Sequence, residues 1–333
     1  MNDVTPDKNL NLPSESRAQL AGSLKTQGYI TDASLISSLY LLEKLGKPLL
    51  VEGEAGVGKT EIAKCLAKAQ GRKLIRLQCY EGLDAQHALY DWDYQRQLLA
   101  IQMAGQMAGQ IPGQMSDQTQ LHSELAGVTP SSNVPDIKQA LYSEEYLLKR
   151  PLFAAIASEE PVVLLIDEID RADQEFEALL LEVLSDFQIS IPELGTFQAR
   201  SKPSVILTSN GIRDLSDALR RRCLYHYIDY PHSDKEQKII RSRLPGIDEN
   251  LAKQVVSYVQ KLRTVGMRKT PGVAESIDWA SALMAIGVDD IRAAPELTDS
   301  TLSCLVKTRN DLELLKREQA ALYGNEPDAN SQQ

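Results

Sequence analysis

Apolar residues along the chain follow two patterns, short continuous runs and longer stretches in which they recur every three or four positions. Continuous runs bounded by turn residues are typical of strands buried on both faces, and the recurring positions are typical of helices. The predicted strands are residues 49–51, 73–79, 162–166, 204–207 and 224–228, and the helices among them are residues 32–45, 60–70, 151–158 and 174–187. Strand and helix therefore alternate, which predicts a parallel sheet covered by helices.

Beyond residue 231 the apolar pattern is helical and no strong strand follows. The predicted helices there are residues 235–243, 251–265, 274–286 and 300–323. We therefore predict an α/β domain over residues 28–232 and a separate helical domain over residues 233–323. A polar C-terminal tail, residues 324–333, follows it.

Two other stretches carry little periodic pattern. Residues 1–27 are polar and interrupted by prolines, which predicts an N-terminal tail or a short helical arm. Residues 83–135 are rich in Gln, Met and Gly and contain a repeated Gln-Met-Ala-Gly, which is typical of a mobile insertion. The methionines Met103, Met107 and Met115 form an apolar helix stripe or plain low complexity, or else an adaptable binding surface.

The net charge, the lengths of the apolar runs and the cysteine spacing exclude or disfavour several classes of protein. The 333-residue chain has a formal net charge of -10, which disfavours nucleic acid as a partner and favours proteins. No apolar run approaches the length of a membrane span, and the amino terminus lacks the pattern of a secretory signal, so we expect a cytoplasmic protein. The cysteines stand far apart, which indicates neither a zinc knuckle nor a disulfide framework.

A glycine-rich loop of the form G-x-x-x-x-G-K-[ST] lies between the first predicted strand and the helix after it. Its residues are Gly53, Glu54, Ala55, Gly56, Val57, Gly58, Lys59 and Thr60. Glycines let successive backbone N–H groups curl around phosphate oxygens, and the positive end of the following helix points at the same anion. In this interpretation Lys59 reaches the β- and γ-phosphates of ATP and Thr60 is a ligand of Mg²⁺. The alternative is a chance glycine-rich turn.

The strand predicted at residues 162–166 ends in two carboxylates, Asp167 and Glu168. The carboxyl edge of a parallel sheet is where ligands bind, so we expect Asp167 to hold Mg²⁺ through water. Glu168 then fits the residue that polarises the attacking water. The alternative is an acidic helix cap after a core strand.

Two further features follow the next strand. Asn210 comes at its end, where a neutral amide can bind both the γ-phosphate and the attacking water, although an Asn-Gly pair is more often a turn. Arg220, Arg221 and Arg222 are adjacent, and a guanidinium given to a neighbour's γ-phosphate would stabilise the transition state. Their alternative is a solvated basic edge.

Taken together, these residues resemble the AAA+ superfamily of ATPases. Residues 53–60 correspond to the Walker A loop, residues 164–168 to Walker B, Asn210 to sensor 1 and residues 219–223 to the arginine-finger box. The resemblance implies a P-loop AAA+ three-layer α/β sandwich with a parallel sheet, followed by a small all-helical lid domain. It also implies ATP and Mg²⁺ as cofactors.

Within that superfamily the chain looks like the MoxR branch and its CoxD-like ATPases. Residues 48–60, residues 270–275, Asp278 and Trp279 carry this resemblance, and the superfamily match covers about residues 28–290. The branch implies a chaperone-like ATPase that forms a ring, usually a hexamer. Such proteins remodel or assemble a protein client, in metalloenzyme maturation among other roles, often with a von Willebrand factor A domain partner.

Finer roles are also implied by the resemblance. Arg222 aligns with the finger itself, and residues 189–199 resemble a hairpin that precedes sensor 1. One departure is Gly272, which stands where many relatives carry the sensor 2 arginine; Arg268 or Lys269 would have to compensate.

These residues support an ATP-hydrolysing, client-remodelling ring as the first hypothesis. The alternatives are a DNA-acting, clamp-loader-like AAA+ protein, suggested by the arginine-finger box, and a nucleotide-gated scaffold with little hydrolysis, suggested by Gly272.

Overall fold

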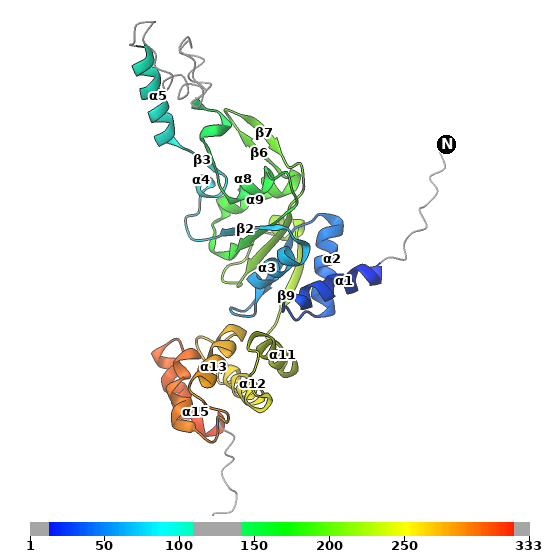
Figure 1. Ribbon diagram of the computed structural model, residues 1–333, viewed down its shortest axis with the longest axis vertical. Helices are drawn as coiled ribbons and strands as arrows, with labels where there is room; N and C mark the ends of the chain where they lie inside the picture. Colours follow the sequence, from blue (N-terminus) through cyan, green and yellow to red (C-terminus); the bar gives the residue numbers. More distant parts are fainter. Residues whose placement is uncertain (1–12, 109–140, 323–333) are drawn as a thin grey trace, which may run out of the picture.

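The computed structural model describes residues 13–108 and 141–322, in the order shown in Figure 1. The strands are β1 (Leu49–Gly53), β2 (Lys73–Gln78), β3 (Tyr90–Trp92), β4 (Leu147–Lys149), β5 (Val162–Asp167), β6 (Gln188–Ile191), β7 (Gly195–Gln198), β8 (Ser204–Ser209) and β9 (Leu224–Ile228). The helices are α1 (Pro13–Thr26), α2 (Ala33–Leu45), α3 (Lys59–Gln70), α4 (Ala85–Ala88), α5 (Tyr94–Ala108), α8 (Pro151–Ile156), α9 (Gln174–Asp186), α10 (Asp217–Arg222), α11 (Ser233–Arg243), α12 (Glu249–Thr264), α13 (Val273–Ala285), α14 (Pro295–Ser300) and α15 (Arg309–Leu322).

The predicted parallel sheet is confirmed. Its strands lie in the order β2-β5-β8-β1-β9, and every neighbouring pair is parallel. The register places the ends of adjacent strands together, with Gln78 opposite Asp167 and Glu52 opposite Ser209. All candidate groups at the strand ends therefore lie along one edge of the sheet.

Alternation along the strands assigns each face of the sheet to its own helices. In β5, Val163 and Leu165 join α1, α2 and α3 in one apolar cluster, and Leu164 and Ile166 join α8 and α9 in another. Side chains in a strand alternate between faces, so a continuous apolar run serves both clusters at once. The result is a three-layer arrangement of helices, sheet and helices (Figure 1).

The C-terminal helices have an apolar cluster of their own, centred on Trp279 and on the buried side of α12. Trp279 is fully buried, and its indole N–H donates to Thr301 Oγ1 at 2.8 Å. The prediction of one helix over residues 300–323 was wrong. The segment consists of the end of α14, a 3₁₀ turn at Leu302–Cys304, and α15, and Leu302, Leu305 and Leu315 are buried together in the apolar cluster of the C-terminal helices.

Of the two structures expected for the N-terminal segment, a tail or a short helical arm, the described part is helical, because residues 13–26 form helix α1. Leu24 is 1% exposed and lies in the same cluster as α2 and α3. The sparse apolar residues of this segment gave it a polar appearance, but a single well-buried leucine fixes it to the domain.

The predicted mobile insertion is ordered over its first part. Residues 83–108 contain α4, β3 and α5, and Trp92 is buried in the cluster under α8 and α9. β3 pairs with β4, so the segment is held by backbone hydrogen bonds as well as by packing. Met103 lies on α5 and is 37% exposed, whereas Met115 falls outside the described residues.

Residues 188–198 form the predicted hairpin, in which β6 and β7 pair antiparallel. Figure 1 shows it at the same end of the molecule as α5, far from the C-terminal helices.

Among residues 13–108 and 141–322, no helix is long and apolar enough to cross a membrane. Within the same ranges, no group of three or more His, Cys, Asp and Glu side chains could hold a metal ion. All four cysteines are free.

Candidate active site

The glycine-rich loop connects β1 to α3, as its sequence context predicts. Gly56 and Gly58 have φ angles of 76° and 93°, in the left-handed region that favours glycine. Helix α3 begins at Lys59, so the backbone N–H groups of its first turn face the loop. The local geometry is that of an anion-binding helix N-terminus.

The Lys59 ammonium is buried inside the loop, with 7% of the residue exposed. Its Nζ donates to the carbonyl oxygens of Gly53 at 2.8 Å and of Glu54 at 2.7 Å. Burial lowers the pKa of Lys59, and the carboxylates of Asp170 and Glu54 oppose that shift. The two hydrogen bonds leave a third N–H donor for a phosphate oxygen.

Asp167 and Thr60, predicted as the metal-binding pair, lie in contact although 107 positions separate them. Thr60 Oγ1 donates to Asp167 Oδ1 at 3.0 Å, and Thr208 Oγ1 on β8 donates to the same oxygen at 2.5 Å. A hydroxyl beside a carboxylate suits Mg²⁺, which prefers oxygen ligands and usually completes its shell with water and substrate phosphates. These two residues therefore fit the metal.

Glu168 has a left-handed backbone, with φ 56° and ψ 51°, which is uncommon for a residue with a side chain. The Thr208 hydroxyl holds its N–H at 2.9 Å. Glu168 Oε2 accepts from Gln78 Nε2 at 3.1 Å, and Arg171 Nε lies 2.8 Å from the same oxygen in an ion pair. Strained backbone that neighbours hold in place is common at functional sites.

Asn210 lies at the end of β8, on the same edge of the sheet. Its backbone N–H donates to Asp170 Oδ2 at 3.2 Å, and the N–H of Ile212 donates to the same oxygen at 3.1 Å. Asp170 is 3% exposed. Asp170, which the sequence did not single out, therefore joins the loop after β5 to the loop after β8.

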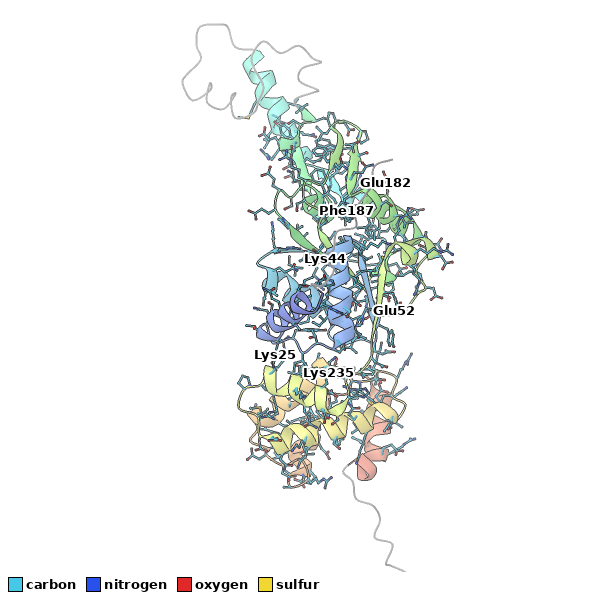
Figure 2. All side chains as sticks on the ribbon, turned by 90° about the vertical axis from the view of Figure 1, so that its right-hand side faces the viewer. Lys25, Lys44, Glu52, Glu182, Phe187 and Lys235 are labelled. Carbon is cyan, nitrogen blue, oxygen red and sulfur yellow. The ribbon has the colours of Figure 1, made fainter. Side chains whose placement is uncertain are left out.

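The adjacent arginines on α10 differ in their surroundings. Arg220 Nη2 lies 3.4 Å from Glu52 Oε2 on β1, and Glu52 is labelled in Figure 2. Arg221 and Arg222 are exposed on α10. Arg220 is thus bound within its own chain, whereas the other two guanidinium groups face outward.

Gly272, where a sensor 2 arginine was expected, lies directly against the phosphate loop. A Cβ atom at this position would come within 2.7 Å of Gly56 Cα and 2.8 Å of Ala55 O. The N–H of Val273 donates to Gly56 O at 3.0 Å. The backbones of Arg268 and Lys269 are instead held by Asp311. A side chain at position 272 would therefore separate the C-terminal helices from the loop.

A cavity of about 270 Å³ opens beside the loop, between the sheet and the C-terminal helices. Its lining is largely apolar and comes from four parts of the chain, the α1–α2 connection, the loop, β9 with its following residues, and the helices α11 and α13. Residues that line it include Tyr29, Ile30, Val57, Ile228, Pro231 and Ile277. The location, next to a phosphate-binding loop, suits the nucleobase of a nucleotide. Sequence patterns missed this cavity because its walls lie far apart in the chain.

Charged pairs surround the apolar part of this cavity. Lys235 Nζ on α11, labelled in Figure 2, lies 3.0 Å from Asp32 Oδ2, and Arg243 Nη2 lies 2.8 Å from Glu61 Oε1. Both pairs connect the C-terminal helices to the α/β layers. His226 also lines the cavity; burial lowers its pKa, which favours the neutral imidazole.

Comparison with known proteins assigns the chain to a family. The family model "ATPase family associated with various cellular activities (AAA)" matches residues 49–229. An uncharacterised protein of Staphylococcus haemolyticus is 24% identical over 268 residues, which is 78% of this chain and 84% of that protein. An uncharacterised protein of Staphylococcus epidermidis is 22% identical over 299 residues, covering 88% and 94%.

Solved structures also match the chain, at lower sequence identity. The RuvB Holliday junction branch migration motor of Thermotoga maritima is 17% identical, with a TM-score of 0.41, covering 85% of this chain and 68% of that one. A mutant of the same protein is 16% identical, with a TM-score of 0.44, covering 93% and 78%.

Proposed function

The chain belongs to the ATPase family associated with various cellular activities, with a P-loop AAA+ fold and a C-terminal helical region. We propose that it hydrolyses ATP to ADP and phosphate. The observation that carries the proposal is the 3.0 Å contact between Thr60 Oγ1 and Asp167 Oδ1. It brings the end of the phosphate loop and the end of β5 to one point, where the substrate's phosphates and Mg²⁺ would meet.

Each residue then has a defined task. Backbone N–H groups of the loop and Lys59 bind the β- and γ-phosphates, and Thr60 and Asp167 hold the metal. Bound Mg²⁺ supplies neutralisation of the phosphate charge. Glu168 orients the attacking water, and Asn210 supplies a neutral amide beside the γ-phosphate. The cavity beside Val57 receives the nucleobase.

Substitution of Glu168 by Gln tests this proposal. We expect phosphate release to fall about 100-fold or more while nucleotide binding persists, because a neutral amide cannot accept a proton from water but keeps the size of the side chain. Phosphate release and binding of a fluorescent ATP analogue are measured in parallel. The matched control is Glu175→Gln, an exposed carboxylate in the first turn of α9. Unchanged turnover in Glu168→Gln would remove the basis of the assignment.

At a finer level, we propose a MoxR-type ring, a hexamer, that remodels a protein client with a von Willebrand factor A domain partner. The acidic overall charge and the hairpin β6–β7 support this proposal. Size determination with ATP bound to Glu168→Gln tests the ring, and the protein that copurifies with that variant identifies the client. A monomer at all concentrations with ATP would contradict the ring.

A nucleotide-gated scaffold is the second candidate, and two contacts favour it. Glu168 contacts both Gln78 and Arg171. Gly272 stands at the sequence position where many relatives carry the sensor 2 arginine, so that no guanidinium is supplied from there. Both features would slow hydrolysis. This candidate predicts tight ATP binding without phosphate release even at concentrations at which rings form.

A further inference from the structure

A guanidinium group lies on the metal-binding carboxylate of the site. Arg76, on the edge strand β2, donates to Asp167 Oδ2 from Nη2 at 2.6 Å and from Nε at 3.1 Å. The Asp167 side chain is 2% exposed and that of Arg76 is 48% exposed. Nε and Nη2, the two donors on one edge of the guanidinium, therefore both bind the buried Oδ2 of Asp167.

The hydrogen-bonding capacity of Asp167 is used on both oxygens. Oδ1 accepts from Thr208 and Thr60, whereas Oδ2 accepts from Arg76 and, at 3.2 Å, from Thr60. The strongest charged partner of this carboxylate is thus a cation that belongs to the chain itself. A divalent cation near the same carboxylate would meet a positive charge already bound there, and at such distances two positive charges repel strongly.

The Arg76 side chain can move away from Asp167. About half of its side chain is exposed, and it extends from the outermost strand of the sheet. Its Nη2 also donates to Gln78 Oε1, while Gln78 Nε2 donates to Glu168 Oε2. A movement of the guanidinium would therefore be transmitted through one amide to the carboxylate that orients water.

We propose that Arg76 is an internal cation that competes with Mg²⁺ for the Asp167 carboxylate, so that metal binding requires its guanidinium to withdraw. The inference rests on the proposed function, because it concerns the metal of the same site. Arg76 acts through Asp167, and it lowers the metal affinity that the Thr60–Asp167 pair would otherwise have.

The test measures binding of Mn²⁺, a paramagnetic substitute for Mg²⁺, to the ADP-bound full-length protein by electron paramagnetic resonance. We expect Arg76→Gln to lower the dissociation constant of Mn²⁺ by about three- to tenfold, the effect of removing one partly exposed ion pair. An unchanged or a higher dissociation constant would overturn the proposal. No turnover is needed for this readout.

Arg171→Gln is the matched control, because it removes another guanidinium beside the site that contacts Glu168 and not Asp167. We expect it to change the Mn²⁺ dissociation constant less than about twofold. An equal effect of both variants would show that only the general charge matters, and would also overturn the competition.

Thermal unfolding verifies that the variants are folded. If Arg76→Gln does not fold, Arg76→Lys replaces it, since lysine keeps the charge but cannot form the two-point contact; it should bind Mn²⁺ about twofold more tightly than the wild type. A lysine variant identical to the wild type counts against the proposal. A wild-type protein that binds neither ADP nor Mn²⁺ instead refutes the proposed function itself.

Discussion

Two glycines from distant parts of the sequence determine how the C-terminal helices meet the phosphate loop. Gly272 and Gly56 lie so close that neither accommodates a Cβ atom without displacement of backbone. At the start of α13, Glu275 Oε2 accepts the N–H of Gly272 at 3.0 Å and so orients this contact. Residue 272 therefore carries no side chain that could contact a nucleotide, and its backbone packs directly against the loop.

Gly272→Ala should lower the free energy of unfolding by about 1–3 kcal/mol, because the added methyl group overlaps Gly56 and Ala55. It should also weaken nucleotide binding, since the helices that close the cavity are displaced. Chemical denaturation and nucleotide titration measure the two effects. Gly22→Ala in α1 is the control; no atom lies within 4 Å of its added Cβ, and it should stabilise by about 0.5–1 kcal/mol. An unchanged Gly272→Ala protein would contradict the contact.

His226, which lines the cavity, makes the stability of the fold depend on pH. Burial lowers its pKa below the ordinary value of 6.5; Lys235 lowers it further and Asp32 opposes the shift. The unfolded chain therefore binds the proton more readily, and the stability that His226 contributes is present above pH 6.5 and is lost as the pH falls through its lowered value.

We expect His226→Asn to flatten the decrease in the denaturation midpoint below pH 6.5, measured against the wild type across that range. The exposed His232→Asn serves as control and should leave the wild-type profile intact. An identical profile for His226→Asn would rule out this residue as the source.

At the scale of elements, helix α1 is part of the α/β layers and not an appendage. It contacts both α2 and α3, and Leu24 is the residue that it buries most completely. Directly after α1, Gly28, Tyr29 and Ile30 line the cavity beside the phosphate loop. The helix therefore supports one wall of the site as well as the core.

Leu24→Ala should cost about 2–5 kcal/mol of folding free energy, the usual range for a leucine truncated in a packed core. Lys25→Ala, one position further along and exposed, should change it by less than about 0.5 kcal/mol. Denaturant titration compares the variants. Equal stability of both would restore the interpretation of this segment as a tail.

For the whole molecule, we propose that the exposed Arg222 contacts the phosphate of a nucleotide bound to a second copy of the chain. We expect Arg222→Ala to lose hydrolysis while keeping its own loop intact. The Lys59→Ala variant lacks the phosphate-binding lysine but keeps Arg222. A mixture of the two variants should recover part of the activity, because some interfaces then combine an intact loop with an intact Arg222. Phosphate release at a series of mixing ratios is the measurement, and no recovery at any ratio would argue against action between subunits.

Features that depend on neighbours along the chain could be predicted from the amino-acid sequence. The apolar runs predicted the strands of the sheet, the glycine pattern located the loop before α3, and Asp167 and Glu168 followed from a core strand that ends in carboxylates. These signals are local, because strand and helix periodicity and the glycine requirement of a tight loop act over a few residues.

Contacts between residues far apart in the sequence became visible in the folded chain and not before. In the sequence, Arg76 is an ordinary polar residue of an edge strand, but in the structure its guanidinium binds Asp167. Gly272 stands in the sequence where relatives carry an arginine, but in the structure the phosphate loop fills the space that a side chain would need. The cavity likewise needs the α1–α2 connection, β9 and α13 together. Each of these is a contact between segments whose pairing follows from strand order and helix packing, and no periodicity within a single segment specifies it.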